Sequence, residues 1–294
     1  MSMRITNQTI YAAQQWRVQS SLQALANAQQ AAASGKRITR PSDDPAGTST
    51  ALGVRASIAQ NDQYSRNITD AQSWTTTTDS ALTQTDTLLR KVRDLVVQAS
   101  NGTTTAAAKS AIADQIDAIK QQLLVQANAK VGGRNAFAGT SSASGAYDTT
   151  TYAWAGSSSD LVQRRIGQNN VVQVDVNGSN VFGSGASSVF ADLDGISTTL
   201  RANGNPQASL TAIDTRLRSV ESAQATVGSV ENAISAANSV QQSRGIALTQ
   251  QQSDVENVDT AQAAINLTNQ NNVYQAALLV SSKTMQTNLM DFLK

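Results

Sequence analysis

Residues 68–99, with the sequence ITDAQSWTTTTDSALTQTDTLLRKVRDLVVQA, decide the fold, because apolar and small side chains recur in them at alternating spacings of three and four. This spacing puts the side chains on one face of an α-helix, which therefore needs a helical partner along much of its length. Several positions are threonine or alanine, which predicts close packing between helices. The positions are Ile68, Ala71, Thr75, Thr78, Leu82, Thr85, Leu89, Val92, Val96 and Ala99.

Helix signals extend this pattern on both sides. Asp44 followed by Pro45 predicts an N-cap with proline at the first helical position, and Gly102 predicts the end of the same helix. Pro206, preceded by asparagine, repeats the cap signature before a third long helix. The predicted apolar faces are Ile112, Ile116, Ile119 and Leu123 for a second helix over about 105–130, and Leu210, Ile213, Leu217, Val220, Val227, Val230, Ile234 and Ala237 for the third.

Both ends of the chain are predicted to be amphipathic helices rich in alanine, glutamine and asparagine, over about Ile5–Ala33 and Val255–Leu293. Ser253 and Glu256 fit a capping box that would open the last helix. The last helix carries two apolar stripes with polar residues between them, so we expect it to contact several neighbours. One stripe is Ile265, Ala276, Leu279 and Leu293, and the other is Leu267, Tyr274, Leu278, Met285 and Phe292.

The middle of the chain, residues 137–205, is rich in glycine, serine and threonine and predicts a small β-rich insertion. Val171–Val176 is predicted as a strand, Asn177-Gly178 as a type I′ hairpin turn, and Val181-Phe182 as the start of the return strand. The predicted fold is mainly α, with paired N- and C-terminal helices, a long helical-bundle rod and this outer insertion. The predicted domains are a terminal coiled-coil assembly domain of residues 1–45 and 253–294, a helical rod domain of residues 46–136 and 206–252, and an outer β-rich domain of residues 137–205.

Composition argues against catalysis. The 294 residues contain no histidine and no cysteine, which removes the commonest general base, thiolate nucleophiles and the usual zinc ligands. With a net charge of +1 the chain has no block of like charge for nucleic acid, and no apolar run approaches the length of about 20 residues that spans a bilayer. Aromatic residues make up only 4%, so aliphatic side chains are expected to carry the packing. We expect no enzyme activity and no cofactor or metal, and we interpret Asp254, Glu256 and Asp259 as favourable charges in the first turn of a helix.

The loop between the first two helices concentrates charge, and the sequence allows two interpretations of it. The charged side chains could form an ion-pair latch between subunits, or they could cap the next helix within a solvated loop. The residues concerned are Lys36, Arg37, Arg40, Asp43 and Asp44.

Motifs at both ends of the chain are specific in combination. The first is Ser34-Gly35-Lys36-Arg37-Ile38 with Pro41-Ser42-Asp43-Asp44-Pro45-Ala46, and the others are Gly133–Thr140, Val255–Ala261, Tyr274–Leu278 and the ending Leu289-Met290-Asp291-Phe292-Leu293. Together they resemble the flagellin-related axial proteins of bacterial flagella, and among these the hook–filament junction proteins. Lys36 and Pro45 depart from the usual flagellin pattern toward that of the junction proteins. The resemblance covers roughly residues 1–140 and 245–294.

The resemblance implies an extracellular structural protein of the flagellum, made in the cytoplasm and exported by the type III apparatus without a cleaved signal. It implies a homo-oligomer, as a ring or helical layer, between the preceding hook-associated protein and flagellin, and an export chaperone bound before secretion. The expected subunit-interface residues are Ile10, Leu22, Leu25, Ile265, Leu267, Tyr274, Leu278, Leu279, Met285, Leu289, Phe292 and Leu293. The expected chaperone-binding residues are Val273, Ala277, Leu278, Met285 and Leu289, and the inter-subunit loop is Lys36, Arg37, Arg40, Asp43 and Asp44.

Two other classes of protein stay open as alternatives. A flagellin proper would polymerise along the whole filament, although Pro41, Pro45 and the Asp291-Phe292-Leu293 ending argue against it. A cytoplasmic signalling coiled coil would show uninterrupted antiparallel heptads, which the insertion breaks. Because short helices with polar seams are marginal without tertiary contacts, we also expect both terminal helices to be disordered in the secreted monomer and to fold on assembly.

Overall fold

A computed structural model describes the backbone of residues 7–292 and the side chains of Thr9 and of residues 11–283. The chain divides into two compact units. The terminal unit consists of residues 1–59 and 245–294, and the central unit consists of residues 60–244. The three-domain division expected from the sequence remains a prediction beside this two-unit division.

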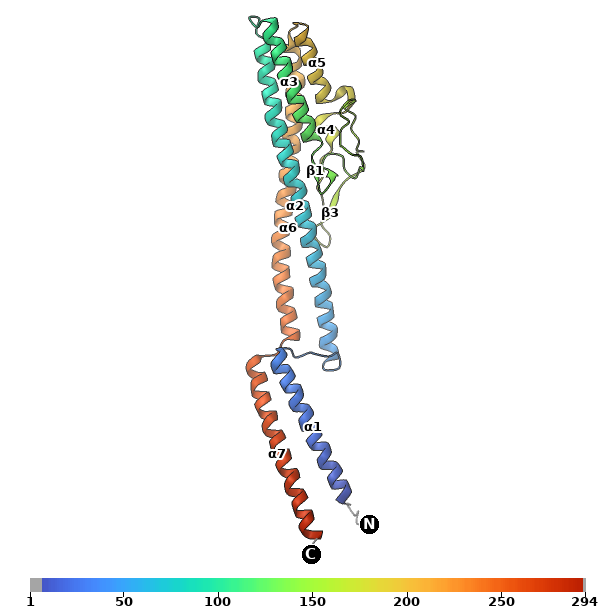
Figure 1. Ribbon diagram of the computed structural model, residues 1–294, viewed down its shortest axis with the longest axis vertical. Coiled ribbons are helices and arrows are strands. Elements are labelled where there is room, and N and C mark those ends of the chain that lie inside the picture. Colours follow the sequence, from blue (N-terminus) through green and yellow to red (C-terminus); the bar gives the residue numbers. More distant parts are fainter. Residues whose placement is uncertain (1–6, 293–294) are drawn as a thin grey trace. The chain divides into compact units, whose positions relative to one another are not determined.

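In the terminal unit, α1 (Asn7–Ser34) and α7 (Thr260–Phe292) pack against each other as an antiparallel pair (Figure 1). The least exposed residues of each helix recur at spacings of three and four, which is the periodicity of a two-helix seam. Pairing of the terminal helices, expected from the sequence, is therefore present within one chain. The seam residues are Gln14, Val18, Ser21, Leu25 and Ala28 on α1, and Ala263, Leu267, Gln270, Tyr274 and Ala277 on α7.

The predicted start of the last helix is wrong by several residues. Ser253 and Glu256 belong to α6 (Leu210–Glu256), and α7 begins only at Thr260. Asp259 caps α7 instead, because its carboxylate accepts hydrogen bonds from the backbone N–H groups of Ala261 at 2.8 Å and Gln262 at 3.3 Å. A capping box at Ser253 is excluded because the Glu256 carboxylate is engaged elsewhere, by Arg55.

The central unit is built on α2 (Pro45–Ala99), α3 (Ala106–Ala127) and α6, with α2 and α6 also contributing to the terminal unit. Every position of the predicted stripe between Ile68 and Ala99 is buried, which confirms the heptad pattern. The predicted faces of α3 and α6 are buried or half-buried against it. The start of α2 also follows the sequence signal, since Asp44 accepts a hydrogen bond from Gly47 N at 2.8 Å.

The insertion contains two short antiparallel strand pairs. The first pair, β1 (Lys130–Val131) with β2 (Arg134–Asn135), turns at Gly132-Gly133, where both glycines have positive φ. The second pair, β3 (Gln163–Arg165) with β4 (Val171–Gln173), confirms half of the predicted strand over 171–176. The rest of this region consists of loops and the helices α4 (Gly178–Phe182), η1 (Gly185–Ser187), α5 (Val189–Arg201) and η2 (Pro206–Ser209).

The predicted hairpin at Asn177-Gly178 is wrong. A type I′ turn needs positive φ at both central residues, but Asn177 has φ −68°. Its side chain instead accepts a hydrogen bond from Ser179 N at 2.9 Å and so caps α4. Val181 and Phe182, expected on a return strand, are buried on this short helix.

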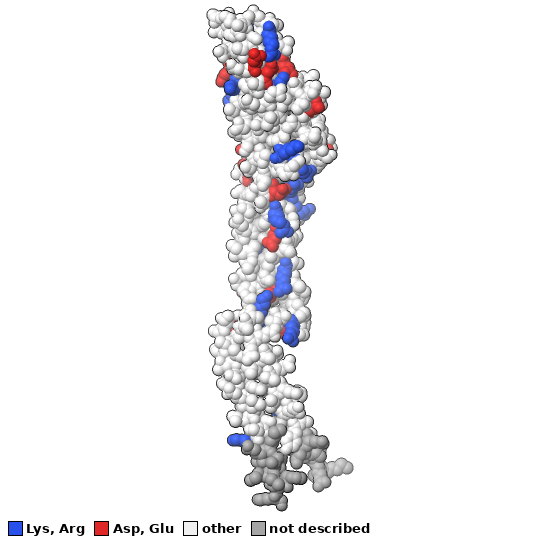
Figure 2. Space-filling view, viewed as in Figure 1, with Lys and Arg blue, Asp and Glu red and all other residues white. Residues whose placement is uncertain are grey.

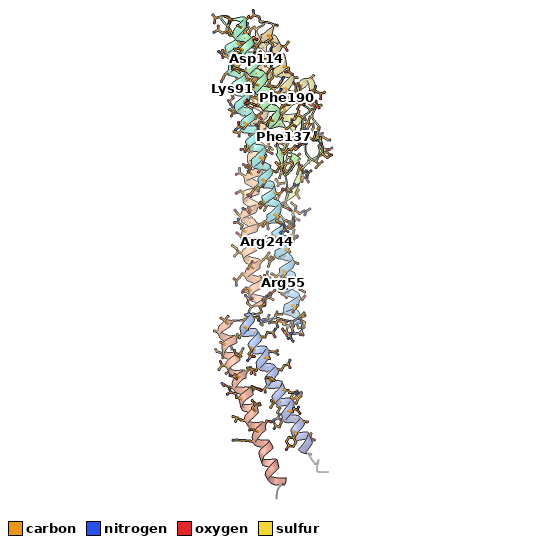
Figure 3. The ribbon with its side chains drawn as sticks, viewed as in Figure 1. Arg55, Lys91, Asp114, Phe137, Phe190 and Arg244 are labelled. Carbon is orange, nitrogen blue, oxygen red and sulfur yellow. The ribbon has the colours of Figure 1, made fainter. Side chains whose placement is uncertain are left out.

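Six of the twelve aromatic residues lie in the insertion, which composition alone did not predict. Phe137 and Phe182 meet edge to face with ring centroids 5.3 Å apart, and Tyr147 meets Phe190 at 5.4 Å. Phe190 lies in the first turn of α5 and Phe137 follows β2, and both belong to the buried cluster that includes residues of α3 (Figure 3). Such pairs add specific geometry to the burial of large rings, so this cluster fixes the insertion to the helices of the central unit.

Candidate assembly surface

The terminal helices present a surface with few charges. In α1 the only charged residue is Arg17, and in α7 the charged residues are Lys283 and Asp291. Figure 2 shows this contrast, since white covers most of the two helices whereas blue and red side chains gather on the central unit. Because this helix pair carries so little charge, packing it against further helices removes few charged side chains from water.

Large apolar side chains lie exposed on the same two helices, outside the seam. Trp16 is 70% exposed, Leu279 is 64% exposed and Ile265 is 55% exposed. Exposed apolar side chains of this kind are candidates for burial by a partner of a folded protein. The exposed apolar set, called here the outer row, is Tyr11, Trp16 and Leu22 on α1, and Ile265, Val273, Leu278, Leu279 and Val280 on α7.

The structure places the expected interface residues in two groups. Leu25 is buried in the α1–α7 seam, where Leu267 and Tyr274 are half-buried, so these three side chains serve the intrachain pair. The outer row contains Leu22, Ile265, Leu278 and Leu279. The side chains of Ile10, Met285, Leu289 and Phe292, and the whole of Leu293, lie outside the described residues.

The expected chaperone-binding residues divide in the same way. Val273 and Leu278 are exposed in the outer row, and Ala277 is half-buried in the seam. Met285 and Leu289 again lie outside the described side chains. Sequence periodicity did not single out Trp16, Tyr11 or Val280, although Trp16 is the most exposed aromatic residue described.

Two connecting segments cross beside the terminal helices and are bonded to each other. Gly35, with φ +66°, ends α1 in the left-handed conformation that favours glycine. Its carbonyl accepts a hydrogen bond from Val258 N at 3.0 Å, and Arg37 N donates to Glu256 O at 2.7 Å. The segment leaving α1 is therefore paired with the segment entering α7.

Glu256 joins these segments to α2. Its side chain is 4% exposed, Arg55 Nε lies 2.7 Å from one carboxylate oxygen, and Lys36 Nζ lies 3.6 Å from the other. The hydrogen bond from Arg55, together with Gln252 and Lys36, holds the pKa of the Glu256 carboxyl below its usual value despite burial. This role of Glu256 was not predicted from the sequence, where the Lys36-Arg37 pair is the one signal that favours a nearby carboxylate.

The charged loop is occupied by contacts within the chain. Asp43 accepts hydrogen bonds from Arg40 N at 2.8 Å and from Thr39, and these bonds lower its pKa. Asp44 caps α2 and pairs with Arg37 at 2.9 Å, and the bond from Gly47 N is the main cause of its lowered pKa. These contacts within the chain support the interpretation that the loop caps α2. An ion-pair latch between subunits remains a prediction.

A groove of about 600 Å³ lies between the seam and this loop. Its lining includes Lys36, Arg37 and Arg40 of the loop and small residues such as Ala24 on α1 and Ala263 on α7. Among the described residues, no group of three or more acidic side chains is placed to hold a metal ion. Within the residues that the structure describes, none of the helices has the length and apolar character needed to span a bilayer.

Two family models match the chain over both of its helical arms. The bacterial flagellin N-terminal helical region matches residues 5–142, and the bacterial flagellin C-terminal helical region matches residues 210–293. Residues between the two matches include β3, β4 and α5 of the insertion. The chain belongs to the bacterial flagellin family.

Individual proteins of known name are also similar to the chain. Flagellar hook-associated protein 3 of Salmonella typhimurium strain LT2 is 28% identical over 194 residues, which are 66% of this chain and 61% of that protein. Flagellar hook-associated protein 3 of Escherichia coli strain K12 is 31% identical over 162 residues, 55% of this chain and 51% of that protein. The chain thus spans between half and about three fifths of the length of these relatives. Flagellins of Clostridium tyrobutyricum and Bacillus subtilis match over shorter stretches.

The fold is similar to that of a solved flagellar protein. The flagellar junction protein FlgL of Legionella pneumophila aligns with a TM-score of 0.58 at 15% identity, over 71% of this chain and all of that one. At this identity the likeness describes the fold, and it agrees with the predicted arrangement of long helices with a small insertion.

Proposed function

We propose that this chain is a structural adaptor of the bacterial flagellum, joining the hook to the flagellin filament, and that it has no enzyme activity. The observation that carries the proposal is the outer row on α1 and α7, in a chain of the flagellin family. Relatives named hook-associated protein 3, and a similar fold named a junction protein, support the junction as its place.

The outer row supplies the driving force for assembly. Burying apolar surface contributes about 25 cal/mol per Å², and Trp16, Ile265 and Leu279 lose this contribution while they face water. A neighbouring copy that covers the outer row would restore this contribution to the free energy. Because α1 and α7 carry so few charges, like-charge repulsion does not oppose a ring or helical layer of copies.

The other partners follow from this place in the flagellum. The adaptor contacts the preceding hook-associated protein on one side and flagellin on the other, and it lies outside the cell. Export by the type III apparatus would deliver it without a cleaved signal. An export chaperone that covers Val273 and Leu278 in the cytoplasm would keep the outer row from self-association before secretion.

A flagellin proper is the second candidate, because flagellins also match the chain. The two functions differ in how far copies of the protein extend along the flagellum. A flagellin adds layers of itself along the whole filament, whereas an adaptor forms a short zone and then accepts a different subunit. The position of the protein along the flagellum therefore distinguishes them.

A paired substitution tests the role of the outer row. Ile265→Asp with Leu279→Asp changes two exposed side chains, so we expect the soluble chain to keep its helical circular dichroism signal. Cells that contain only this variant should secrete it into the medium and lack filaments, because a charged row cannot be buried between copies.

Val125→Asp is the matched control, since Val125 is 68% exposed on α3 of the central unit. This variant should support normal filaments. Normal filaments in cells with the double variant would overturn the proposed role of the row. The amount of each variant in the medium separates failed assembly from failed export.

A further inference from the structure

The chain contains three Asn-Gly pairs, at Asn101, Asn177 and Asn203, and the structure treats their glycines differently. In an Asn-Gly pair the backbone nitrogen of glycine can attack the asparagine side-chain carbonyl carbon. The reaction requires that this nitrogen lose its proton and approach the carbon. It is therefore slowed when the glycine N–H is held in a hydrogen bond or buried.

Two of the three glycines are held in this way. Gly178 N donates to Phe137 O at 3.0 Å, and the glycine is buried against Phe137 and Trp154. Gly204 N donates to Thr199 O at 2.8 Å, packed against that residue. Breaking either hydrogen bond must precede attack.

Gly102 differs from both. It is exposed in the loop between α2 and α3, and no described residue accepts a hydrogen bond from its N–H. An added Cβ there would meet nothing within 4 Å, so the backbone has room to move. Asn101 is also exposed, so water can reach both residues.

The side chain of Asn101 is also polarised for attack. Its Oδ1 accepts hydrogen bonds from Thr103 N at 3.3 Å and from Thr103 Oγ1 at 3.1 Å. Negative charge develops on this oxygen in the tetrahedral intermediate, and donors placed there stabilise it. Asn177 has equivalent donors, Ser179 N and Ser179 Oγ, so the free glycine N–H is what distinguishes Asn101.

We propose that Asn101 is a site of spontaneous deamidation in the folded protein, and that Asn177 and Asn203 are protected. The Gly102 nitrogen forms a bond to Asn101 Cγ and gives up its proton, while the Cγ–Nδ2 bond breaks and ammonia leaves. Water then opens the resulting succinimide at either carbonyl, which gives aspartate or isoaspartate. The new carboxylate lies just beyond the C-terminus of α2, where the helix dipole disfavours negative charge, so the modification loosens this turn.

Peptide mapping by mass spectrometry tests the proposal on the purified full chain. After incubation at mildly alkaline pH, the acid form should accumulate at Asn101 roughly tenfold faster than at Asn177 or Asn203, as expected when one net hydrogen bond must break first. In denaturant all three sites should react at similar rates. An isoaspartyl methyltransferase assay identifies the isoaspartate product.

Gly102→Ala is the matched variant, because the site has room for a Cβ and Gly102 is not among the positive-φ glycines. It should fold normally and slow the reaction at residue 101 without changing the other two sites. Equal native rates at the three sites would overturn the proposal. So would an unreacted Asn101 in native protein whose denatured control reacts.

Discussion

Glu256 and Arg55 are separated by 201 residues in the sequence, yet Arg55 Nε donates a hydrogen bond of 2.7 Å to the Glu256 carboxylate. Glu256 is the last residue of α6, and Arg55, labelled in Figure 3, lies in the first part of α2. The backbone carbonyl of the same glutamate accepts from Arg37 N at 2.7 Å. One residue therefore fastens α2, α6 and the segment that follows α1 within the terminal unit.

Replacing Glu256 with glutamine should loosen this crossing. Glu256→Gln keeps the shape of the side chain but removes its charge, and Arg55 and Lys36 are about half exposed, so the expected loss is about 1 kcal/mol of local opening free energy. Amide hydrogen exchange at Arg37 and Val258 measures it. Asp254→Asn is the control, because Asp254 is an exposed carboxylate two residues away that contacts Gln250. Equal protection in both variants would contradict the role of Glu256.

Acid should open the same crossing. The folded-state pKa of Glu256 is lowered from 4.5, chiefly by the Arg55 hydrogen bond, so its contribution is complete above pH 4.5 and is lost as pH falls through the lowered value. Limited proteolysis of the connecting segments should therefore accelerate below pH 4.5. The acceleration should be smaller in Glu256→Gln, which keeps the carboxyls of Asp43 and Asp44, whose pKa values are also lowered, but lacks that of Glu256. An identical pH dependence in the two proteins would refute this.

Trp74 is expected to hold the insertion onto α2. The guanidinium carbons of Arg134 and Arg164 lie 6.0 and 5.9 Å from the centroid of its buried ring, which packs with Val162 and Ile166. Trp74→Ala should reduce the unfolding free energy of the central unit by about 3–5 kcal/mol in urea titrations followed by circular dichroism.

Trp16 provides the control for that substitution, because it is 70% exposed. Trp16→Ala should change the unfolding free energy by less than about 0.5 kcal/mol. A similar effect of the two substitutions would show that the Trp74 contacts do not stabilise the central unit.

The terminal helices should be far less protected than the central unit in the isolated monomer. Leu25 and Ala263 are buried in the seam, whereas most other described side chains of α1 and α7 are half-buried or exposed. So little burial leaves the pair marginal without neighbours. Hydrogen exchange should give fast exchange in α1 and strong protection in α2 between Ile68 and Ala99. Protection of α1 equal to that of α2 would contradict folding on assembly.

Long periodic helices were the part of the fold that the sequence could predict. The stripe from Ile68 to Ala99 repeats many times, so its burial follows from periodicity alone, and Asp44-Pro45 marks its start by local chemistry. The resemblance of the quoted motifs to flagellar proteins was confirmed, because all of them lie within residues 5–142 and 210–293, which the two family models match.

Short elements were predicted poorly because their signals are ambiguous. Asn177-Gly178 fits a hairpin turn or a helix cap equally well, and packing of Val181 and Phe182 against the aromatic cluster selects the cap. Glu256 was misassigned for a similar reason, since a glutamate three residues after a serine fits a capping box wherever it occurs. Its true partner, Arg55, is identified only by the tertiary fold.

The position of the protein along the flagellum tests the central claim most directly. Immunogold electron microscopy of intact cells, with antibody against residues 137–205 and cells lacking the protein as control, measures it. A single cluster of label where the hook meets the filament is the result expected for a junction adaptor. Label along the whole filament would make the protein a flagellin and contradict the account, and specific label confined to the cell interior would contradict it as well.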